Sequence, residues 1–201
     1  MQLQANAWEA LAVREGSKYM SISVETTIDR KEIMTGRVLH VTVDTVRINN
    51  SDVTSTREVV WHHGASAILP VTDDGKLILV RQFRYAAAQA MLEVPAGKIE
   101  QDGENPDVCA ARELEEEAGV TCGELLPLGA IYTSPGFCNE KIYLYLARKL
   151  KPSKQHLDED EFVDLERYTP AEMEQLIIDG DIIDAKTIAC FAKARRYLPG
   201  L

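Results

Sequence analysis

Three glutamates near the middle of the chain, Glu113, Glu116 and Glu117, have the residue type and the spacing to bind a metal ion. Residues three and four positions apart share one face of a helix, so these carboxylates would gather on one side. Like charges at this spacing repel by roughly 0.2–0.5 kcal/mol per pair, and a divalent cation would turn that repulsion into binding. Carboxylate oxygens are the ligands that Mg²⁺ and Mn²⁺ prefer. The cluster therefore predicts a metal site, with a solvated glutamate-rich face as the alternative.

The segment around these glutamates carries the signals of a helix start and a helix stop. Asn105 is a good N-cap, Pro106 suits the first helical position, and Gly119 favours a stop. Only helix-compatible residues stand between them. We expect the helix to face the core through an apolar stripe on a different side from the glutamates, formed by Val108, Ala111, Leu114 and Ala118.

Alternating and β-branched runs predict strands on both sides of this helix. The turn 72–75, Thr-Asp-Asp-Gly, is a strong hairpin signal between two apolar runs. Pro170 opens one C-terminal helix and Asp184 caps another. This order of elements is typical of an α/β or α+β sandwich. We expect strands at 36–48, 57–62, 65–71, 76–82, 91–94, 125–132, 141–147 and 162–167, the first two forming a hairpin, and helices at 170–180 and 184–198.

Length and composition exclude several classes of protein. The chain has 201 residues, which suits one domain or one domain with an added segment. Its net charge of −10 argues against binding to nucleic acid or to an anionic membrane surface. The four cysteines are scattered without a CxxC pair, which favours free thiols in a reducing compartment. No signal-peptide pattern or membrane-length apolar stretch is visible, so we expect a cytoplasmic protein.

The order of residues around the glutamates is more specific than their charge. A glycine and a glutamate, Gly103 and Glu104, stand upstream, and the helix reads Arg112-Glu113-Leu114-x-Glu116-Glu117-x-Gly119-Val120. This pattern resembles the signature of the Nudix hydrolases. One position departs from it, because Gly97 and Glu104 enclose six residues, one more than the family pattern has. The resemblance implies a Nudix-like sandwich, a mixed β-sheet between helices, with the N-terminal β-hairpin segment added at residues 1–63 and the hydrolase domain at 64–201.

Flanking segments resemble one branch of that family, the ADP-ribose pyrophosphatases. The similar segments are 57–60, 81–85, 92–98 and 134–137. This resemblance implies metal-dependent hydrolysis of the diphosphate bond of ADP-ribose to AMP and ribose 5-phosphate. Two alternatives stay open: hydrolysis of another nucleoside diphosphate sugar, and a Nudix-fold protein that binds without catalysis. In this branch the N-terminal hairpin packs across a homodimer, so we expect a homodimer here.

The resemblance also implies roles for individual residues around Mg²⁺ or Mn²⁺. Glu113 and Glu117 match the main metal ligands, Glu116 matches a third, and the carbonyl of Ala96 matches a backbone ligand. Arg112, adjacent to Glu113 and four residues before Glu116, would orient the glutamates. Glu104 would belong to the same supporting set.

A glutamate on a late loop would accept the proton of the attacking water. Glu159 and Glu161 are the candidates, and the resemblance favours Glu161, because the family pattern runs from this glutamate into the following strand, as residues 161–165 do here. The alternative is a solvated acidic turn. The residues that would bind the nucleotide sugar are Arg57, Arg84, Ser134, Gly136 and Glu140, although the Ser-Pro-Gly sequence at 134–136 is equally typical of a simple tight turn.

Overall fold

The computed structural model describes residues 23–100, 103–157 and 162–198. The chain divides into two compact units, one formed by residues 1–31 and 43–57 and the other by residues 32–42 and 58–201. The strands are β1 (Glu25–Thr35), β2 (His40–Ile48), β3 (Thr54–Trp61), β4 (Ala65–Pro70), β5 (Leu77–Arg84), β6 (Gln89–Glu93), β7 (Ala96–Lys98), β8 (Val120–Tyr132), β9 (Lys141–Pro152) and β10 (Val163–Tyr168). The helices are α2 (Pro106–Ala118), α3 (Pro170–Asp179) and α4 (Ala185–Ala194), with short 3-10 turns at Tyr85–Ala87 and Arg195–Tyr197.

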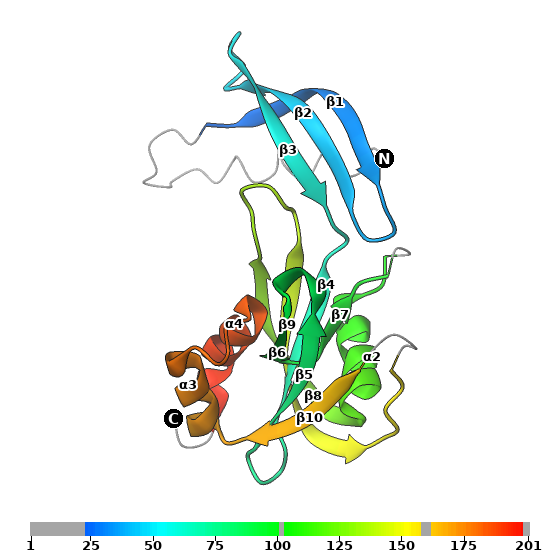
Figure 1. The fold of residues 1–201 in the computed structure, drawn as a ribbon, viewed down its shortest axis with the longest axis vertical. Coiled ribbons are helices and arrows are strands. Elements are labelled where there is room, and N and C mark those ends of the chain that lie inside the picture. The colour runs from blue at the N-terminus through cyan, green and yellow to red at the C-terminus, as the bar shows by residue number, and fades with distance from the viewer. Residues whose placement is uncertain (1–22, 101–102, 158–161, 199–201) are drawn as a thin grey trace. The chain divides into compact units, whose positions relative to one another are not determined.

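The N-terminal strands form a three-stranded sheet in the order β1-β2-β3, so the predicted two-stranded hairpin was incomplete (Figure 1). β1 was missed because its sequence, ETTIDRKEIMT, is largely polar and every residue in it is exposed, which leaves no alternating pattern to detect. The strand predicted at 36–48 begins only at His40 in the structure. Residues 36–39 form a turn, in which the amide of Gly36 donates to the carbonyl of Leu39 at 2.8 Å.

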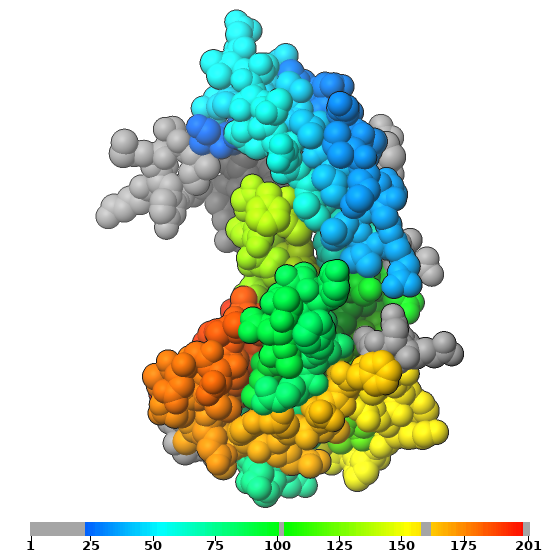
Figure 2. Space-filling model, viewed as in Figure 1, coloured from blue at the N-terminus to red at the C-terminus, as the bar shows by residue number. Residues whose placement is uncertain are grey.

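The second unit holds a four-stranded sheet in the order β7-β4-β9-β8 and a three-stranded sheet in the order β10-β5-β6. β4 runs parallel to β9 while the other pairs of the larger sheet are antiparallel, so that sheet is mixed. Helix α2 packs on β4, β7 and β8, and α4 packs on β4, β8 and β9. Figure 1 shows α2 on one side of these strands and α3 with α4 on the other, and Figure 2 shows α3 and α4 together in orange and red. The predicted mixed sheet between helices is confirmed.

The core lies on both faces of β4 because successive side chains of a strand point to opposite faces. Ala67 and Leu69 belong to the buried cluster that includes Phe191 of α4. Ile68 belongs to a second cluster, with Leu114 of α2. The two helices are therefore fixed against the same central strand from opposite sides.

The turn at 72–75 is present, but the hairpin predicted across it is wrong. The amide of Thr72 donates to the carbonyl of Lys76 at 2.8 Å, which closes the turn. Beyond a single bridge between Val71 and Leu77, β4 and β5 separate into different sheets. A turn sequence determines the local path of the chain, whereas the choice of sheet depends on partners far away in the sequence. Among the described helices, none is long and apolar enough to cross a membrane.

Candidate active site

Helix α2 begins and ends where the sequence predicts. The side chain of Asn105 accepts a hydrogen bond from the amide of Asp107 at 2.9 Å, and Pro106 occupies the first helical position. Gly119 ends the helix with a φ of 63°, a left-handed conformation that glycine adopts without strain. These boundaries give the three glutamates a regular helical spacing.

The predicted apolar stripe of α2 is only partly the buried face, because Leu114 and Ala118 are buried at 0% and 4% exposure and the other two residues are not. Val108 is 58% exposed and Ala111 is also exposed, whereas Glu113 and Glu117 are only 8% and 3% exposed. The helix is therefore rotated so that two of the glutamates lie on the inner side. The sequence placed the core-facing stripe on a different side from these two glutamates, but the folded chain supplies their carboxylates with donors.

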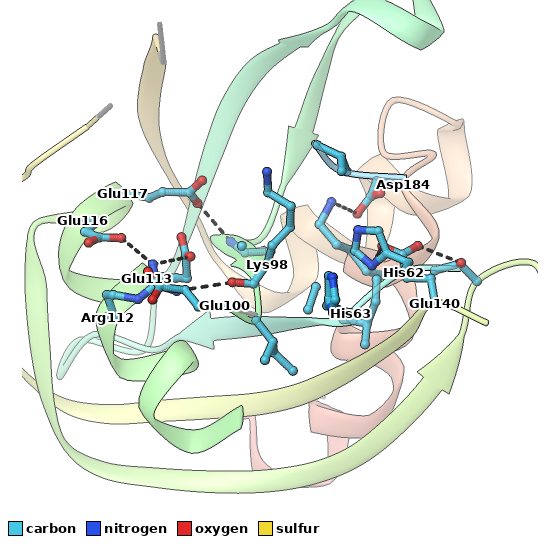
Figure 3. Close-up of a pocket in the computed structure, with 18 of the residues that line it drawn as sticks. His62, His63, Lys98, Glu100, Arg112, Glu113, Glu116, Glu117, Glu140 and Asp184 are labelled. Carbon is cyan, nitrogen blue, oxygen red and sulfur yellow. Dashed lines mark hydrogen bonds and ion pairs between the residues drawn. The ribbon is translucent and has the colours of Figure 1, made fainter. Parts of the chain in front are cut away.

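Arg112 joins three of the carboxylates into one network (Figure 3). Its Nη1 donates to Glu113 Oε1 at 2.6 Å and to Glu116 Oε2 at 2.9 Å, and its Nε donates to Glu104 Oε1 at 3.1 Å. The hydrogen bond from Arg112 holds the pKa of Glu104 below its ordinary value, and the same bond raises the pKa of Arg112. Arg112 thus contacts each residue that the sequence assigned to it.

Strand β7 passes directly against the glutamates. The amide of Ala96 donates to Glu117 Oε2 at 2.9 Å. A Cβ added to Gly97 would lie 2.0 Å from the carboxyl carbon of Glu113, so any side chain at this position would displace the Glu113 carboxylate. The extra residue between Gly97 and Glu104 leaves this close approach intact.

A cavity of about 1130 Å³ opens beside these residues. One part of its wall is α2, with Arg112, Glu113, Glu116 and Glu117. Figure 3 shows Asp184, His62 and Glu140 grouped away from the α2 side chains, with Lys98 between the two groups. The other polar side chains of the wall are Arg37, Arg84, His63, Glu100, Thr133, Ser134, His156 and Lys186. The wall combines carboxylates with several cations, as a site for a metal ion and an anionic ligand requires.

The donor set fits a hard divalent cation by its chemistry. Glu113 and Glu117 are buried carboxylates and Glu116 is half-buried, so oxygen ligands gather in a water-poor position. Among the described residues no three acidic, histidine or cysteine side chains converge closely enough to hold a metal ion. In this arrangement Nη1 of Arg112 donates to both Glu113 and Glu116. Their coordination of a metal stays a prediction.

Most of the residues predicted for the site line the cavity, but not all do. Ala96, Arg84, Ser134 and Glu140 line it together with the α2 residues. Glu104 does not line it, but it contacts two lining residues, Arg112 and the amide of Glu100. Gly136 lies in an exposed turn outside the lining, where the carbonyl of Ser134 accepts from two following amides. Arg57 belongs to β3 and is ion-paired with Glu25. Glu159 and Glu161 lie outside the described residues.

Sequence reasoning missed a second polar cluster at the cavity, formed by Glu93, Lys186 and Asp184. Glu93 is 1% exposed and accepts from Arg84 Nε at 2.9 Å and Arg84 Nη2 at 2.7 Å. Burial alone would raise the pKa of Glu93, but the hydrogen bonds and charges of Arg84 and Lys186 hold it below its ordinary value. The available signal was a charged residue inside the short apolar strand predicted at 91–94.

His62 directly follows β3 and contacts the turn at that end of the cavity. Its Nδ1 accepts a hydrogen bond from the amide of Gly64 at 3.0 Å and lies 3.6 Å from Glu140 Oε1. Burial lowers the pKa of His62. The ring therefore shapes the chain at this end of the cavity as a neutral acceptor.

Comparison with known proteins agrees with this geometry. The family model described as NUDIX domain matches residues 61–191. The chain is 44% identical over 176 residues to an ADP-ribose pyrophosphatase of Bacillus subtilis, covering 87% of this chain and 92% of the relative. It is 45% identical over 166 residues to a methanol dehydrogenase activator of Bacillus methanolicus, covering 82% and 89%. A crystal structure of an ADP compounds hydrolase superposes with a TM-score of 0.78 at 25% identity, covering 90% of this chain and 98% of that one. The chain therefore belongs to the Nudix hydrolase family.

Proposed function

We propose that this enzyme hydrolyses the diphosphate bond of ADP-ribose and releases AMP and ribose 5-phosphate. The observation that carries the proposal is the cavity, where the carboxylates of α2 share one wall with the cations Arg84, Lys98 and Lys186. A diphosphate needs both a metal ion and cationic side chains to neutralise its charge. Similarity to ADP-ribose pyrophosphatases of Bacillus subtilis (44% identity) and Mycobacterium tuberculosis (34% identity) supports the choice of substrate.

In the proposed mechanism Glu113, Glu117 and the carbonyl of Ala96 would hold Mg²⁺ or Mn²⁺, and Glu116 would bind it directly or through water. The bound cation would lower the pKa of the attacking water and neutralise charge on the diphosphate. Arg112 keeps the carboxylates in place through its hydrogen bonds to Glu113 and Glu116. Glu104 supports Arg112 from the other side of the guanidinium.

Glu161 is proposed to accept the proton from the attacking water. The described segment that precedes it is bound to the glutamate helix. Gln155 Nε2 donates to the carbonyl of Glu117 at 2.7 Å, and the amide of His156 donates to the carbonyl of Glu116 at 3.1 Å. This segment therefore starts beside the metal-site glutamates. A carboxylate outside α2 that does not hold the metal can accept the proton of the attacking water.

The test is a hydrolysis screen over ADP-ribose, ADP-glucose, GDP-mannose, dinucleotides and nucleoside triphosphates with Mg²⁺ or Mn²⁺. The expected outcome is the highest kcat/KM for ADP-ribose, with AMP and ribose 5-phosphate as the two products by chromatography. A higher kcat/KM for another sugar nucleotide would favour the alternative substrate, to which the 29% identity with GDP-mannose pyrophosphatases is relevant. Release of free adenine, or binding without turnover, would contradict the proposal.

A second candidate function is activation of a methanol dehydrogenase, favoured by the 45% identity to a protein of that name. The test adds this protein to a methanol dehydrogenase assay and repeats it with Glu117→Gln. Activation that the variant loses would show that hydrolysis is the activating step. Activation that the variant keeps would indicate a binding role separate from hydrolysis.

We also propose that residues 1–63 form an N-terminal dimer-forming segment and that residues 64–201 form the hydrolase domain. The matched domain range 61–191 and the compact unit that includes residues 58–201 support the second boundary. The partner would be a second copy of the chain, and the bound molecule a small nucleotide sugar.

A further inference from the structure

Glu93 is a buried carboxylate placed behind the cavity wall. Its side chain is 1% exposed and it does not line the cavity, whereas both of its cationic partners, Arg84 and Lys186, do. A carboxylate buried to this degree persists as an anion only when it is paired and hydrogen-bonded. Glu93 meets that condition through two side chains that reach it from different elements, β5 and α4.

The bonds to Glu93 fix one edge of the Arg84 guanidinium. Nε and Nη2 of Arg84 donate to the two carboxylate oxygens in the fork arrangement that arginine makes with carboxylates. The remaining nitrogen, Nη1, donates to no described residue. The Arg84 side chain is 40% exposed and lines the cavity, so this free edge is available to a ligand there.

The opposite side of Glu93 is fixed by the start of α4. Lys186 Nζ is hydrogen-bonded to Glu93 Oε2 and lies 3.1 Å from Asp184 Oδ2, the N-cap carboxylate of α4. The residue that follows β6 is bound as well, because the amide of Val94 donates to Thr187 Oγ1 at 2.9 Å. The Glu93 carboxylate therefore has little freedom to move, and neither has the Arg84 edge that it holds.

We propose that Glu93 is a positioning residue for the hydrolysis reaction. It holds Arg84 so that Nη1 faces the diphosphate of the substrate, and Lys186 anchors Glu93 from the other side. The inference rests on the proposed function, because it requires a diphosphate in the cavity. Arg84 and the predicted metal ligand Glu117 line the same cavity.

A purely structural role for Glu93, tying β6 to α4, makes a different prediction. Loss of a structural tie would lower stability and reduce activity by the same factor whether or not Arg84 is present. Loss of a positioning contact should act only through Arg84. The effects of Glu93→Gln and Arg84→Ala on KM would then be non-additive, because the two residues act as one unit.

The experiment measures steady-state kinetics on ADP-ribose with Mg²⁺ for the wild type, Glu93→Gln, Arg84→Ala and the double variant, with a melting temperature for each. Glu93→Gln is expected to raise KM about tenfold, with kcat within about twofold, because a charge-assisted contact with the substrate is weakened. In the Arg84→Ala background the same change should leave KM unaltered. Glu166→Gln is the matched control, since it removes the acceptor of the Arg81 pair in the same sheet and neither residue lines the cavity.

Each outcome separates the two proposals. A wild type without activity on ADP-ribose would overturn the proposed function and this inference with it. An active wild type whose KM does not change in Glu93→Gln, or whose KM changes equally in both backgrounds, would overturn the positioning role alone. If Glu93→Gln fails to fold, Glu93→Asp replaces it. That variant keeps the charge but shortens the reach, and it is expected to raise KM in the wild-type background only.

Discussion

At the residue scale, the site depends on how buried charges are satisfied. Arg112 contacts three carboxylates, and the backbone amide of Ala96 donates to a fourth, that of Glu117. Gly97 lets β7 approach Glu113 more closely than any side chain would allow. The same helix therefore has an inner set of glutamates held by donors and an outer glutamate, Glu115, that is bonded to Ser153.

The first prediction concerns the metal-site glutamates. Glu113→Gln and Glu117→Gln should each lower kcat on ADP-ribose by about 100-fold or more, because each removes a charged ligand at the reacting phosphate. EDTA should abolish turnover, and Mg²⁺ or Mn²⁺ should restore it. Glu115→Gln on the same helix is the control and should retain activity, since Glu115 does not line the cavity. Full turnover in metal-free buffer would refute the metal requirement.

The second prediction concerns the proton acceptor. Carboxylates that hold a cation are poor bases, because the cation lowers their pKa, so the proton should go to a residue outside α2. Glu161→Gln is expected to lower kcat strongly while the affinities for metal and substrate stay nearly unchanged. Glu159→Gln should have a much smaller effect. A severe Glu159→Gln variant would move the role by two residues, and two mild variants would exclude this segment from proton transfer.

At the scale of elements, the cavity lies between two helices that pack on opposite sides of one strand. β4 places α2 on one face and α4 on the other. The N-terminal end of α4 then contributes Asp184 and Lys186 to the same cavity that α2 lines with glutamates. The contact between β6 and α4 at Glu93 is therefore a connection between the two walls of the site as well as part of the core.

The third prediction is that the stability contributed by the ion pairs of Glu93 depends on pH. The pKa of Glu93 is lowered in the folded protein, so its contribution to stability is present above the unfolded pKa of about 4.3 and is lost as pH falls through the folded value. At pH 7, Glu93→Gln should lower the free energy of unfolding by roughly 2 kcal/mol. Denaturant titrations from pH 7 to pH 3 should show the difference between wild type and variant shrinking below about pH 4.3. A difference independent of pH would contradict the assignment of a charged, paired Glu93.

At the scale of the whole molecule, the chain combines a hydrolase domain with an N-terminal three-stranded sheet. β1 is exposed along its entire length and carries apolar residues, among them Ile28, Ile33 and Met34, at 44%, 51% and 48% exposure. An exposed edge strand with apolar side chains is a ready surface for a second chain. Two-fold pairs are also the commonest form of oligomer.

The fourth prediction is therefore a homodimer. Light scattering at micromolar concentration should give twice the chain mass of 22.4 kDa. Ile33→Glu should shift the mass toward the monomer, because it places a charge on the exposed apolar surface of β1. Ile178→Glu is the control, since Ile178 is 70% exposed on α3, and it should leave the mass unchanged. A wild type with the mass of a single chain would contradict the prediction.

The sequence by itself determined the glutamate helix, its caps and the family, because those depend on residues close together in the chain. Asn105, Pro106 and Gly119 act on their immediate neighbours, and the spacing of the glutamates follows from the helix alone. It could not assign β4 and β5 to separate sheets or detect the uniformly exposed β1, since pairing partners are distant and β1 has no alternation.

Only the tertiary structure decided which face of α2 is buried and which residues complete the cavity. The sequence placed the core-facing stripe of α2 on a different side from Glu113 and Glu117, but donors from β7 and from Arg112 make the burial of both glutamates possible. Glu93 and Lys186, 93 residues apart, meet only because α4 packs across the sheet. A charged group can be buried only where the fold brings partners to it, and the local sequence does not show which distant residues those partners are.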